Sequence, residues 1–428
     1  MKKILILSYF YHPCSLTASN RVSGFAKHLN KFGIFPVIIT RNWDLPINTP
    51  EDVLKSTGSS VKHEIFDSHE VYYLPYKSSL RDRIFLNSKN STLKKYTSKI
   101  LTILTMVLEL VSNRFIPFAN LLYFTLDYLQ KNKDIEFILT SANPFIQFKF
   151  CYQIHKKTGI PWIADYRDAW TTNKMVANIR SMNKPLNILH RFFEKKWCKT
   201  AVFFTSVSDS YVDSIKKLIK INGYKILNGY EVKYNTTEFS TYKHFQIVYN
   251  GTLYYNQDVE TFLKAVKTFN LKNDNSKIHI HFAGLGFDVK QTQRVKNEMV
   301  GFEKYLNIST WLSKDEIIEI QKNADLLLML TYSGFKGIPS SKLYEYIGLQ
   351  KNILVYPNDY DIIQEIVLNT KLGLICNSDK EILENITELI TRKELKIKKE
   401  EINSKNIDLY SRERQTEILA KLINQVIY

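Results

Sequence analysis

Short apolar segments alternate with amphipathic helical segments along this chain of 428 residues, and the alternation restricts its fold more than any other feature. Ile4–Phe10 is apolar except for Ser8, as expected of a strand buried on both faces. Apolar residues then recur at helical spacing from Val22 to Phe32, and Phe35–Thr40 is the next apolar segment. The pattern therefore predicts βαβ units and an α/β fold with parallel sheets.

The alternation runs in two series, and a polar segment at 231–243 separates them. The second series begins at Phe245–Tyr249. A chain of this length exceeds the size of a single hydrophobic core, so two domains are expected. We predict an N-terminal domain over 1–235 with a helical insertion near 84–130, a second domain over 236–408, and a C-terminal helix over 409–428.

Composition limits which binding partners and which cellular compartment are expected for this protein. The chain has 59 Lys and Arg against 42 Asp and Glu, a net charge of +17. An anionic membrane, a phosphate-rich substrate or merely solvated lysines would explain this charge. Nucleic acid is not expected, because no RNP-like motif, zinc finger or arginine tract is present. The four cysteines lie far apart without a CxxC pair, which favours a reducing cytoplasm.

Neither metal binding nor membrane spanning is expected from the sequence. The nine histidines show no ligand spacing, and Asp359-Tyr360-Asp361 is interpreted as a helix cap. No segment reaches the roughly 18–20 apolar residues of a membrane span. The apolar segment 100–128 is interrupted by charges and a proline, so it predicts inserted helices or a membrane-surface patch. The second interpretation depends on the basic residues upstream, Lys94, Lys95 and Lys99.

The segment 337–348, GIPSSKLYEYIG, has the features of a diphosphate site. Ser340 is a favourable N-cap for a helix, whose free N–H groups attract anions. The hydroxyls of Ser340 and Ser341 and the ammonium of Lys342 would add to this attraction. Glu345 lies one turn further, where it could accept hydrogen bonds from ribose hydroxyls. The alternative is a solvated helix with an exposed Glu345.

Two other segments carry candidate chemistry. At 165–170, DYRDAW, two carboxylates flank a guanidinium at a strand end, where they could orient hydroxyls or stabilise developing charge. The alternative is an internal Arg–Asp ion pair that braces the loop. At 249–253, YNGTL, a glycine turn follows the first strand of the second series, as Gly284-Leu285-Gly286 follows the next one. An ordinary strand-to-helix connection remains the alternative.

These segments, in this order, resemble those of the family 4 retaining glycosyltransferases. Residues 337–348 are similar to the bacterial motif P-S-K-L-Y-E-Y, with Ser340 in the place of the proline, and 165–170 resembles D-x-R-D-x-W. The resemblance implies the GT-B fold: two Rossmann-like domains that face each other across a cleft, with the C-terminal helix crossing back to the N-terminal domain. It covers most of the chain.

The sequence departs from this family at the diphosphate. Many members have an Arg after the turn glycine and a Lys five residues later, but here Thr252 and Gln257 take those places. The first glutamate of the common E-x7-E pair is replaced by Gly337. Lys342 is therefore expected to neutralise the diphosphate. Arg167 stands where several relatives have a histidine, so no histidine base is expected.

The resemblance implies a retaining hexosyl or N-acetylhexosaminyl transfer from a nucleoside-diphosphate sugar to a glycan or lipid-linked acceptor, in bacterial surface polysaccharide synthesis. It implies no cofactor or metal and a cytoplasmic enzyme, with peripheral contact at the inner membrane face left open. The alternatives are a GT-B nucleotide-sugar epimerase and a degenerate glycosyltransferase that binds membranes or polymers. The implied site residues are catalytic Asp165, Arg167 and Asp168; donor-binding Gly251, Thr252, Gly284, Ser340, Ser341, Lys342, Leu343 and Glu345; and acceptor-side Ser19, Arg21 and Trp170.

Overall fold

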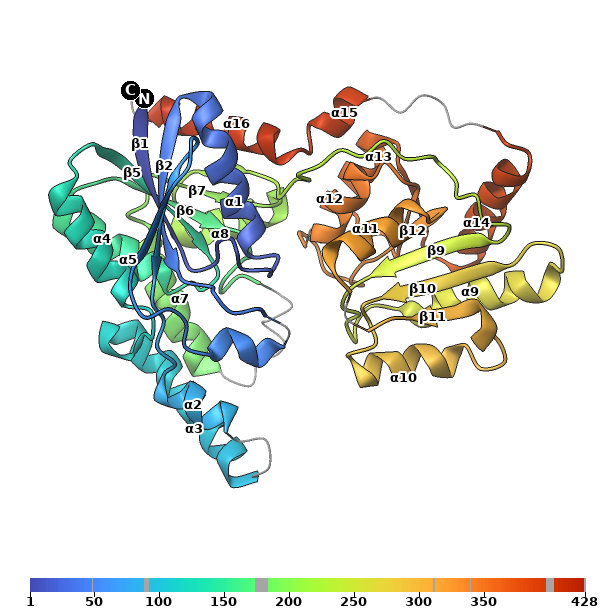
Figure 1. The fold of residues 1–428 in the computed structure, drawn as a ribbon, viewed down its shortest axis with the longest axis horizontal. Helices are drawn as coiled ribbons and strands as arrows, with labels where there is room; N and C mark the ends of the chain where they lie inside the picture. The colour runs from blue at the N-terminus through green and yellow to red at the C-terminus, as the bar shows by residue number, and fades with distance from the viewer. Residues whose placement is uncertain are drawn as a thin grey trace. The chain divides into compact units, whose positions relative to one another are not determined.

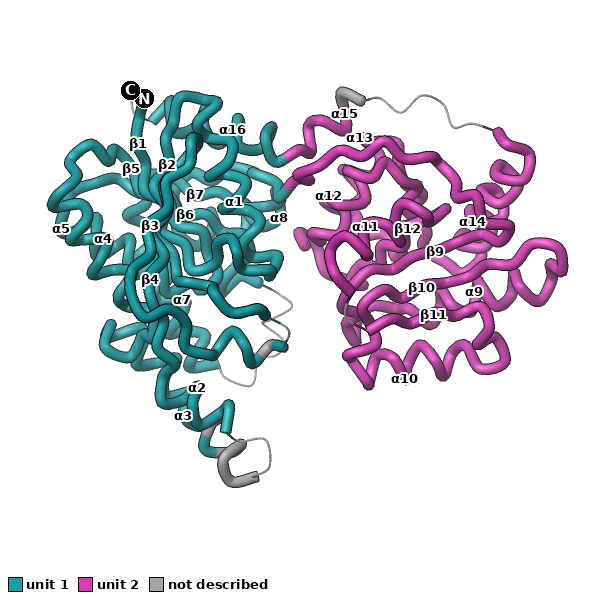
Figure 2. The backbone as a smooth tube through the Cα atoms, viewed as in Figure 1, with its two compact units in different colours: residues 1–228, 412–428 teal, residues 229–411 magenta. Residues whose placement is uncertain are grey.

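Two separate sheets form from the two series of strands. The computed structural model describes residues 1–47, 49–87, 92–173, 184–310, 312–338, 340–397 and 404–426. The N-terminal unit comprises residues 1–228 and 412–428, and the C-terminal unit comprises residues 229–411 (Figure 2). The boundaries predicted from the sequence, 235 and 408, lie a few residues away.

The N-terminal unit is built on an eight-stranded sheet of order β3-β4-β2-β1-β5-β6-β7-β8. Figure 1 labels its strands β1, β2, β5, β6 and β7. Its central strands are fully buried, as the apolar segments predict; Ile4–Leu7 of β1 are all 0% exposed. Neighbouring strands pair in parallel, except that β3 is antiparallel to β4. The strands are β1 Lys2–Ser8, β2 Ile34–Arg41, β3 Lys62–Ile65, β4 Glu70–Leu74, β5 Ile135–Ala142, β6 Trp162–Tyr166, β7 Phe203–Ser206 and β8 Gly223–Lys225.

Helices connect these strands. The described ones are α1 Ser19–His28, η1 Leu29–Phe32, η2 Pro50–Leu54, α2 Leu80–Leu86, α3 Thr92–Val111, η3 Asn113–Phe115, α4 Asn120–Lys131, α5 Gln147–Thr158, α7 Lys184–Cys198 and α8 Asp209–Ile219. The predicted continuous helix to Phe32 thus tightens into a 3-10 turn after His28. Within the described residues, no helix is long and apolar enough to cross a membrane.

The last helix, α16 Arg412–Val426, belongs to the N-terminal unit although it follows the whole C-terminal unit in sequence. It packs against α1, and Leu419 and Ile423 enter the same core as Val22. The two helices approach each other closely at Gly24 of α1, where a Cβ atom would lie 2.8 Å from Cδ of Arg412. The side-chain amide of Gln415 also accepts a 2.7 Å hydrogen bond from the backbone N–H of Leu227.

The C-terminal unit contains a fully parallel six-stranded sheet of order β11-β10-β9-β12-β13-β14. Its strands are β9 Phe245–Asn250, β10 Ile278–Ala283, β11 Leu306–Ile308, β12 Leu326–Leu330, β13 Ile353–Tyr356 and β14 Gly373–Ile375. Its helices are α9 Val259–Lys272, α10 Val289–Glu298, η5 Glu303–Tyr305, α11 Lys314–Lys322, α12 Ser341–Gly348, α13 Ile362–Thr370, α14 Asp379–Glu394 and α15 Ser404–Asp408. Ser313 and Glu316 form a capping box at the start of α11.

The strand order of the C-terminal sheet determines where a ligand site can form. The chain runs from β9 outward to β10 and β11, and then returns to β12 on the other side of β9. In open α/β sheets, ligands bind beside the carboxyl ends of the strands where the order reverses. That point lies between β9 and β12, so the loops after these two strands are the candidates.

Candidate functional site

Two glycines line the carboxyl ends of β9 and β10. Gly251 and Gly284 adopt φ values of 80° and 82°, which L residues rarely adopt. The two backbones are close: the N–H of Gly251 donates a 2.8 Å hydrogen bond to the carbonyl of Ala283, and a Cβ atom on Gly284 would lie 4.0 Å from Cα of Gly251. Ser309, which the sequence analysis did not select, positions this turn through a 3.2 Å hydrogen bond from Gly284 N–H to its Oγ.

The helix α12 starts beside this turn, after the loop that follows β12. Ser340 is its N-cap, as predicted, and its Oγ accepts a 3.3 Å hydrogen bond from the backbone N–H of Lys342. Leu343 is fully buried and fixes the helix on the sheet. Ser341 is exposed and Glu345 is half-buried, one turn into the helix. Pro339 lies outside the described residues.

Lys342 connects α12 to the glycine turn. Its Nζ donates hydrogen bonds to the hydroxyl of Tyr249 at 2.7 Å and to the carbonyl of Thr252 at 3.0 Å. The same Nζ lies 4.0 Å from the centre of the Tyr249 ring, within cation–π range. Burial lowers the pKa of Lys342 to about 7, although the nearby Glu345 carboxylate acts in the opposite direction. The amine is therefore poised to gain a proton when an anion binds beside it.

Gln257 occupies the place of the family's second cation, and the structure gives it a different task. Its side chain is 4% exposed. Its amide nitrogen donates a 2.7 Å hydrogen bond to the carbonyl of Leu330 at the end of β12, and its oxygen accepts one of 2.9 Å from the backbone N–H of Tyr254. Gln257 thus ties the turn after β9 to β12, while the positive charge at the turn comes from Lys342.

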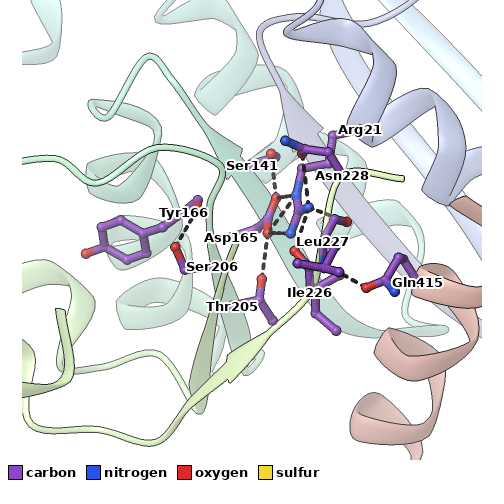
Figure 3. A network of polar contacts seen from close by, with 10 residues as sticks. All are labelled: Arg21, Ser141, Asp165, Tyr166, Thr205, Ser206, Ile226, Leu227, Asn228 and Gln415. Carbon is purple, nitrogen blue, oxygen red and sulfur yellow. Dashed lines mark hydrogen bonds and ion pairs between the residues drawn. The ribbon is translucent and has the colours of Figure 1, made fainter. Parts of the chain in front are cut away.

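In the N-terminal unit, Asp165 is enclosed at the end of β6 (Figure 3). Its carboxylate forms a buried ion pair with Arg21, with a shortest N–O distance of 2.6 Å. The hydroxyls of Ser141 and Thr205, on the strands at either side, each donate a 2.6 Å hydrogen bond to it. Burial alone would raise the pKa of Asp165, but Arg21 and the two hydroxyls outweigh it and hold the pKa below the usual value.

Arg21 joins three parts of the N-terminal unit. From α1 it reaches Asp165 on β6, and its Nη1 donates to the carbonyls of Ile226 and Leu227 at 2.9 and 3.0 Å (Figure 3). Arg21 is 3% exposed and Asp165 is 0% exposed. Neither side chain reaches an exposed surface, although the sequence analysis placed them in the acceptor-side and catalytic groups. Asp165 thus forms an internal Arg–Asp ion pair, as in the alternative interpretation, but its partner is Arg21 and not Arg167.

Ser19 and Trp170, the other two expected acceptor contacts, are also buried. The Ser19 hydroxyl donates to the carbonyls of Cys14 and Leu16, both at 2.8 Å. The Trp170 ring is 3% exposed and stacks on Phe145, with ring centres 5.2 Å apart. Ser19, the first residue of α1, therefore holds the loop that precedes the helix, and Trp170 packs within the loop after β6.

Arg167 and Asp168 retain access to solvent on the loop after β6. They form an ion pair of 2.6 Å, with side-chain exposures of 21% and 47%. Glu194 of α7, a residue not selected from the sequence, holds this loop at Thr171 by accepting hydrogen bonds from the backbone N–H and hydroxyl of that residue, at 3.1 and 2.5 Å. Burial raises the pKa of Glu194 to about 7. Because Glu194 lies 23 residues from Thr171 in the sequence, no local pattern indicated this contact.

Acidic residues elsewhere have structural contacts. Asp359 accepts hydrogen bonds from the backbone N–H groups of Ile363 and Gln364, at 2.9 and 3.0 Å, which confirms the helix-cap interpretation. In the part of the chain that the structure describes, no group of three His, Cys, Asp or Glu side chains is placed to hold a metal ion. The four cysteines are buried and unpaired.

Comparison with known proteins identifies the fold and a family match within the C-terminal unit. Residues 238–406, most of the C-terminal unit, match the family model described as glycosyl transferases group 1. The complete chain has the GT-B fold of solved glycosyltransferases, as expected from the sequence. No curated protein matches the chain in sequence.

Three solved structures illustrate the similarity. Sucrose-phosphate synthase from Thermosynechococcus elongatus is 12% identical, with a TM-score of 0.64 over 100% of this chain and 99% of its own. The lipopolysaccharide outer core galactosyltransferase WaaB is 12% identical, with a TM-score of 0.59 over 99% of each chain. HepE from Anabaena, solved with UDP and glucose, is 11% identical, with a TM-score of 0.53 over 100% of this chain and 98% of its own.

Proposed function

We propose that this protein is a retaining glycosyltransferase that moves a sugar from a nucleoside-diphosphate donor to a hydroxyl of a glycan or a lipid-linked acceptor. The single observation that carries the proposal is the position of the Lys342 ammonium, at the glycine turn and beside the start of α12. The group 1 family match over the C-terminal unit supports it. A role in bacterial surface polysaccharide synthesis is part of the proposal.

The donor belongs to the C-terminal unit in this proposal. The diphosphate would lie against the backbone of Gly251 and Thr252 and the first turn of α12, where free N–H groups and Ser341 favour an anion. Lys342 would neutralise it. Glu345, one turn deeper, would accept hydrogen bonds from the ribose hydroxyls. Gly284 would leave room for the base, since it has no side chain.

The acceptor belongs to the N-terminal unit in this proposal, on the loop after β6. Among the described residues of that loop, Arg167 and Asp168 are the accessible charged side chains, and we assign them to orienting the acceptor hydroxyl and stabilising charge that develops on transfer. The buried Arg21–Asp165 pair would act as a positioning device for the same loop. The leaving diphosphate would take the acceptor proton, so the mechanism requires no histidine base.

A screen of nucleotide sugars tests the proposal. We expect one class among UDP-, GDP-, CDP- and dTDP-sugars to raise the melting temperature, and added acceptor glycans to yield a product with retained anomeric configuration. An epimerised donor formed without any acceptor would establish the epimerase instead. Thermal stabilisation without transfer or donor hydrolysis would indicate a degenerate binding module.

Glu345→Gln should weaken donor binding by about tenfold and leave the melting temperature unchanged. The change removes one charge-assisted hydrogen bond to ribose, which contributes about 1.5–3 kcal/mol, and leaves a weaker neutral one. Titration calorimetry with the stabilising donor measures the affinity. Glu319→Gln, an exposed ion-paired residue of α11 in the same unit, is the matched control and should have no effect. Equal donor affinity in both variants would remove Glu345 from the site.

Asp168→Asn should lower turnover at least about tenfold while donor affinity changes less than about twofold, because the change removes the carboxylate from the acceptor side. Steady-state kinetics and donor titration separate the two effects. Asp209→Asn is the control, since Asp209 also forms an exposed ion pair in the N-terminal unit. A marked fall in melting temperature with unchanged turnover would show that the Arg167–Asp168 pair only braces its loop.

A further inference from the structure

The outer surfaces of α2, α3 and α7 have an uneven charge distribution. Each helix contains one carboxylate, and none of the three is fully exposed. Asp82 of α2 is 1% exposed and accepts a 3.1 Å hydrogen bond from the Tyr76 hydroxyl. Glu194 of α7 is 0% exposed, and Glu109 of α3 is half-buried, where burial raises its pKa to about 7. The exposed charges that the structure describes on α2 and α7 are therefore positive.

On α7 the exposed cations alternate with exposed apolar side chains. Ile188 and Phe192 are 69% and 58% exposed, although apolar side chains of this size are usually turned toward a core. Residues at i, i+4, i+7, i+8 and i+11 share one face of a helix. This face of α7 consists of Lys184, Ile188, Arg191, Phe192 and Lys195, all of them exposed.

The neighbouring helix α3 exposes a second apolar stripe. Ile100, Leu104 and Val111 are 67%, 50% and 62% exposed and follow the same helical spacing, and Ile103 lies beside them at 50%. α3 packs against both α2 and α7, so the stripes belong to adjoining helices of one unit. The side chains of Lys94, Lys95 and Lys99, the basic residues that suggested a membrane contact, lie outside the described residues. The surface is thus defined without them.

We propose that the exposed side chains of α3 and α7, here called the α3–α7 surface, attach the protein to an anionic lipid bilayer. Ile, Leu, Val and Phe side chains would enter the headgroup region while Lys and Arg hold lipid phosphates. A second copy of the chain fits less well, because a two-fold contact through this surface would bring like charges together. The inference does not rest on the proposed reaction, since attachment can be measured without donor or acceptor.

Vesicle co-sedimentation of the full chain tests the proposal. We expect binding to vesicles of phosphatidylcholine mixed with phosphatidylglycerol, little binding to phosphatidylcholine alone, and release as salt is raised. The double variants Arg191→Glu/Lys195→Glu and Ile188→Ser/Phe192→Ser should each weaken binding by at least about tenfold, since each removes one of the two contributions. Ile103→Ser/Leu104→Ser on α3 gives an independent variant if an α7 variant fails to fold.

Matched controls lie elsewhere on the chain. Lys216→Glu/Lys217→Glu changes two exposed cations of α8, and Leu271→Ser/Val300→Ser changes two exposed apolar side chains of the C-terminal unit. Binding of these controls should stay within about twofold of the original. Equal losses in the α7 and α8 charge variants would overturn the proposal in favour of net charge alone. Equally poor binding to both kinds of vesicle at low salt would overturn it outright. Self-association of the protein that the α7 variants abolish would also overturn the proposal.

Discussion

Arg21→Met should lower the free energy of unfolding of the N-terminal unit by about 3–5 kcal/mol, because it leaves the Asp165 carboxylate buried without its cation. The pair is 3% and 0% exposed, so water cannot replace the lost contacts. Four of the five tryptophans, at 43, 162, 170 and 197, lie in this unit. Denaturant unfolding followed by tryptophan fluorescence therefore reports mainly on it.

The loss of stability caused by Arg21→Met should depend on pH. In the original protein, Arg21 holds the pKa of Asp165 below its usual value, so the pair contributes stability above the unfolded pKa and loses it as pH falls through the folded one. Without Arg21, burial raises the pKa of Asp165, and protonation relieves the buried charge in acid. The difference between the two proteins should therefore be largest at neutral pH and smaller at acid pH.

Two further variants identify the cause. Arg414→Met, on α16 of the same unit, breaks an ion pair whose members are 42% and 24% exposed, and should cost less than about 1 kcal/mol. Arg21→Met/Asp165→Leu removes both charges and should recover part of the lost stability. If Arg21→Met lowers the free energy of unfolding no more than Arg414→Met does, the buried pair does not stabilise the N-terminal unit.

Lys342→Met should weaken binding of the nucleotide-sugar donor by about 10- to 100-fold, the equivalent of one charge-assisted hydrogen bond. In the original protein the affinity should also depend on pH. The pKa of Lys342 is lowered to about 7, and a bound diphosphate favours the charged form, so binding takes up a proton. Affinity should be highest below that pKa and should fall up to about tenfold per pH unit above it. Lys342→Met should bind the donor weakly at every pH, without this dependence on pH.

Lys351 provides a matched control for Lys342. It is a second buried lysine of the C-terminal unit with a pKa lowered by burial to about 8, but its Nζ donates to the carbonyls of Thr237 and Ala324. Lys351→Met should lower the melting temperature and leave donor affinity intact. Lys342→Arg should bind donor without the pH slope, because an Arg stays charged. A donor affinity that is equally insensitive to Lys342→Met and Lys351→Met would contradict the diphosphate assignment.

The sequence alone predicted the fold because the fold depends on patterns that are local. The buried parallel strands, the capping box at Ser313 and the N-cap at Ser340 each follow from residues within one element and its cap. The two-unit arrangement follows from two such series in one chain. The return of helix α16 to the N-terminal core was implied by the family resemblance and not by a local pattern, because contacts distant in sequence decide its place.

The sequence alone did not reveal which side chains contact each other. The DYRDAW segment predicts a carboxylate–guanidinium interaction, yet Asp165 pairs with Arg21, 144 residues away, and Arg167 pairs with its neighbour Asp168. Lys342 was expected to neutralise the diphosphate, but its hydrogen bonds from helix α12 to Tyr249 and Thr252 are contacts that the sequence did not reveal. Local patterns record which faces are apolar, and so they determine strands, helices and caps. Ion pairs and pKa shifts depend on distance and burial, which are set only when the sheet brings separate strand ends together.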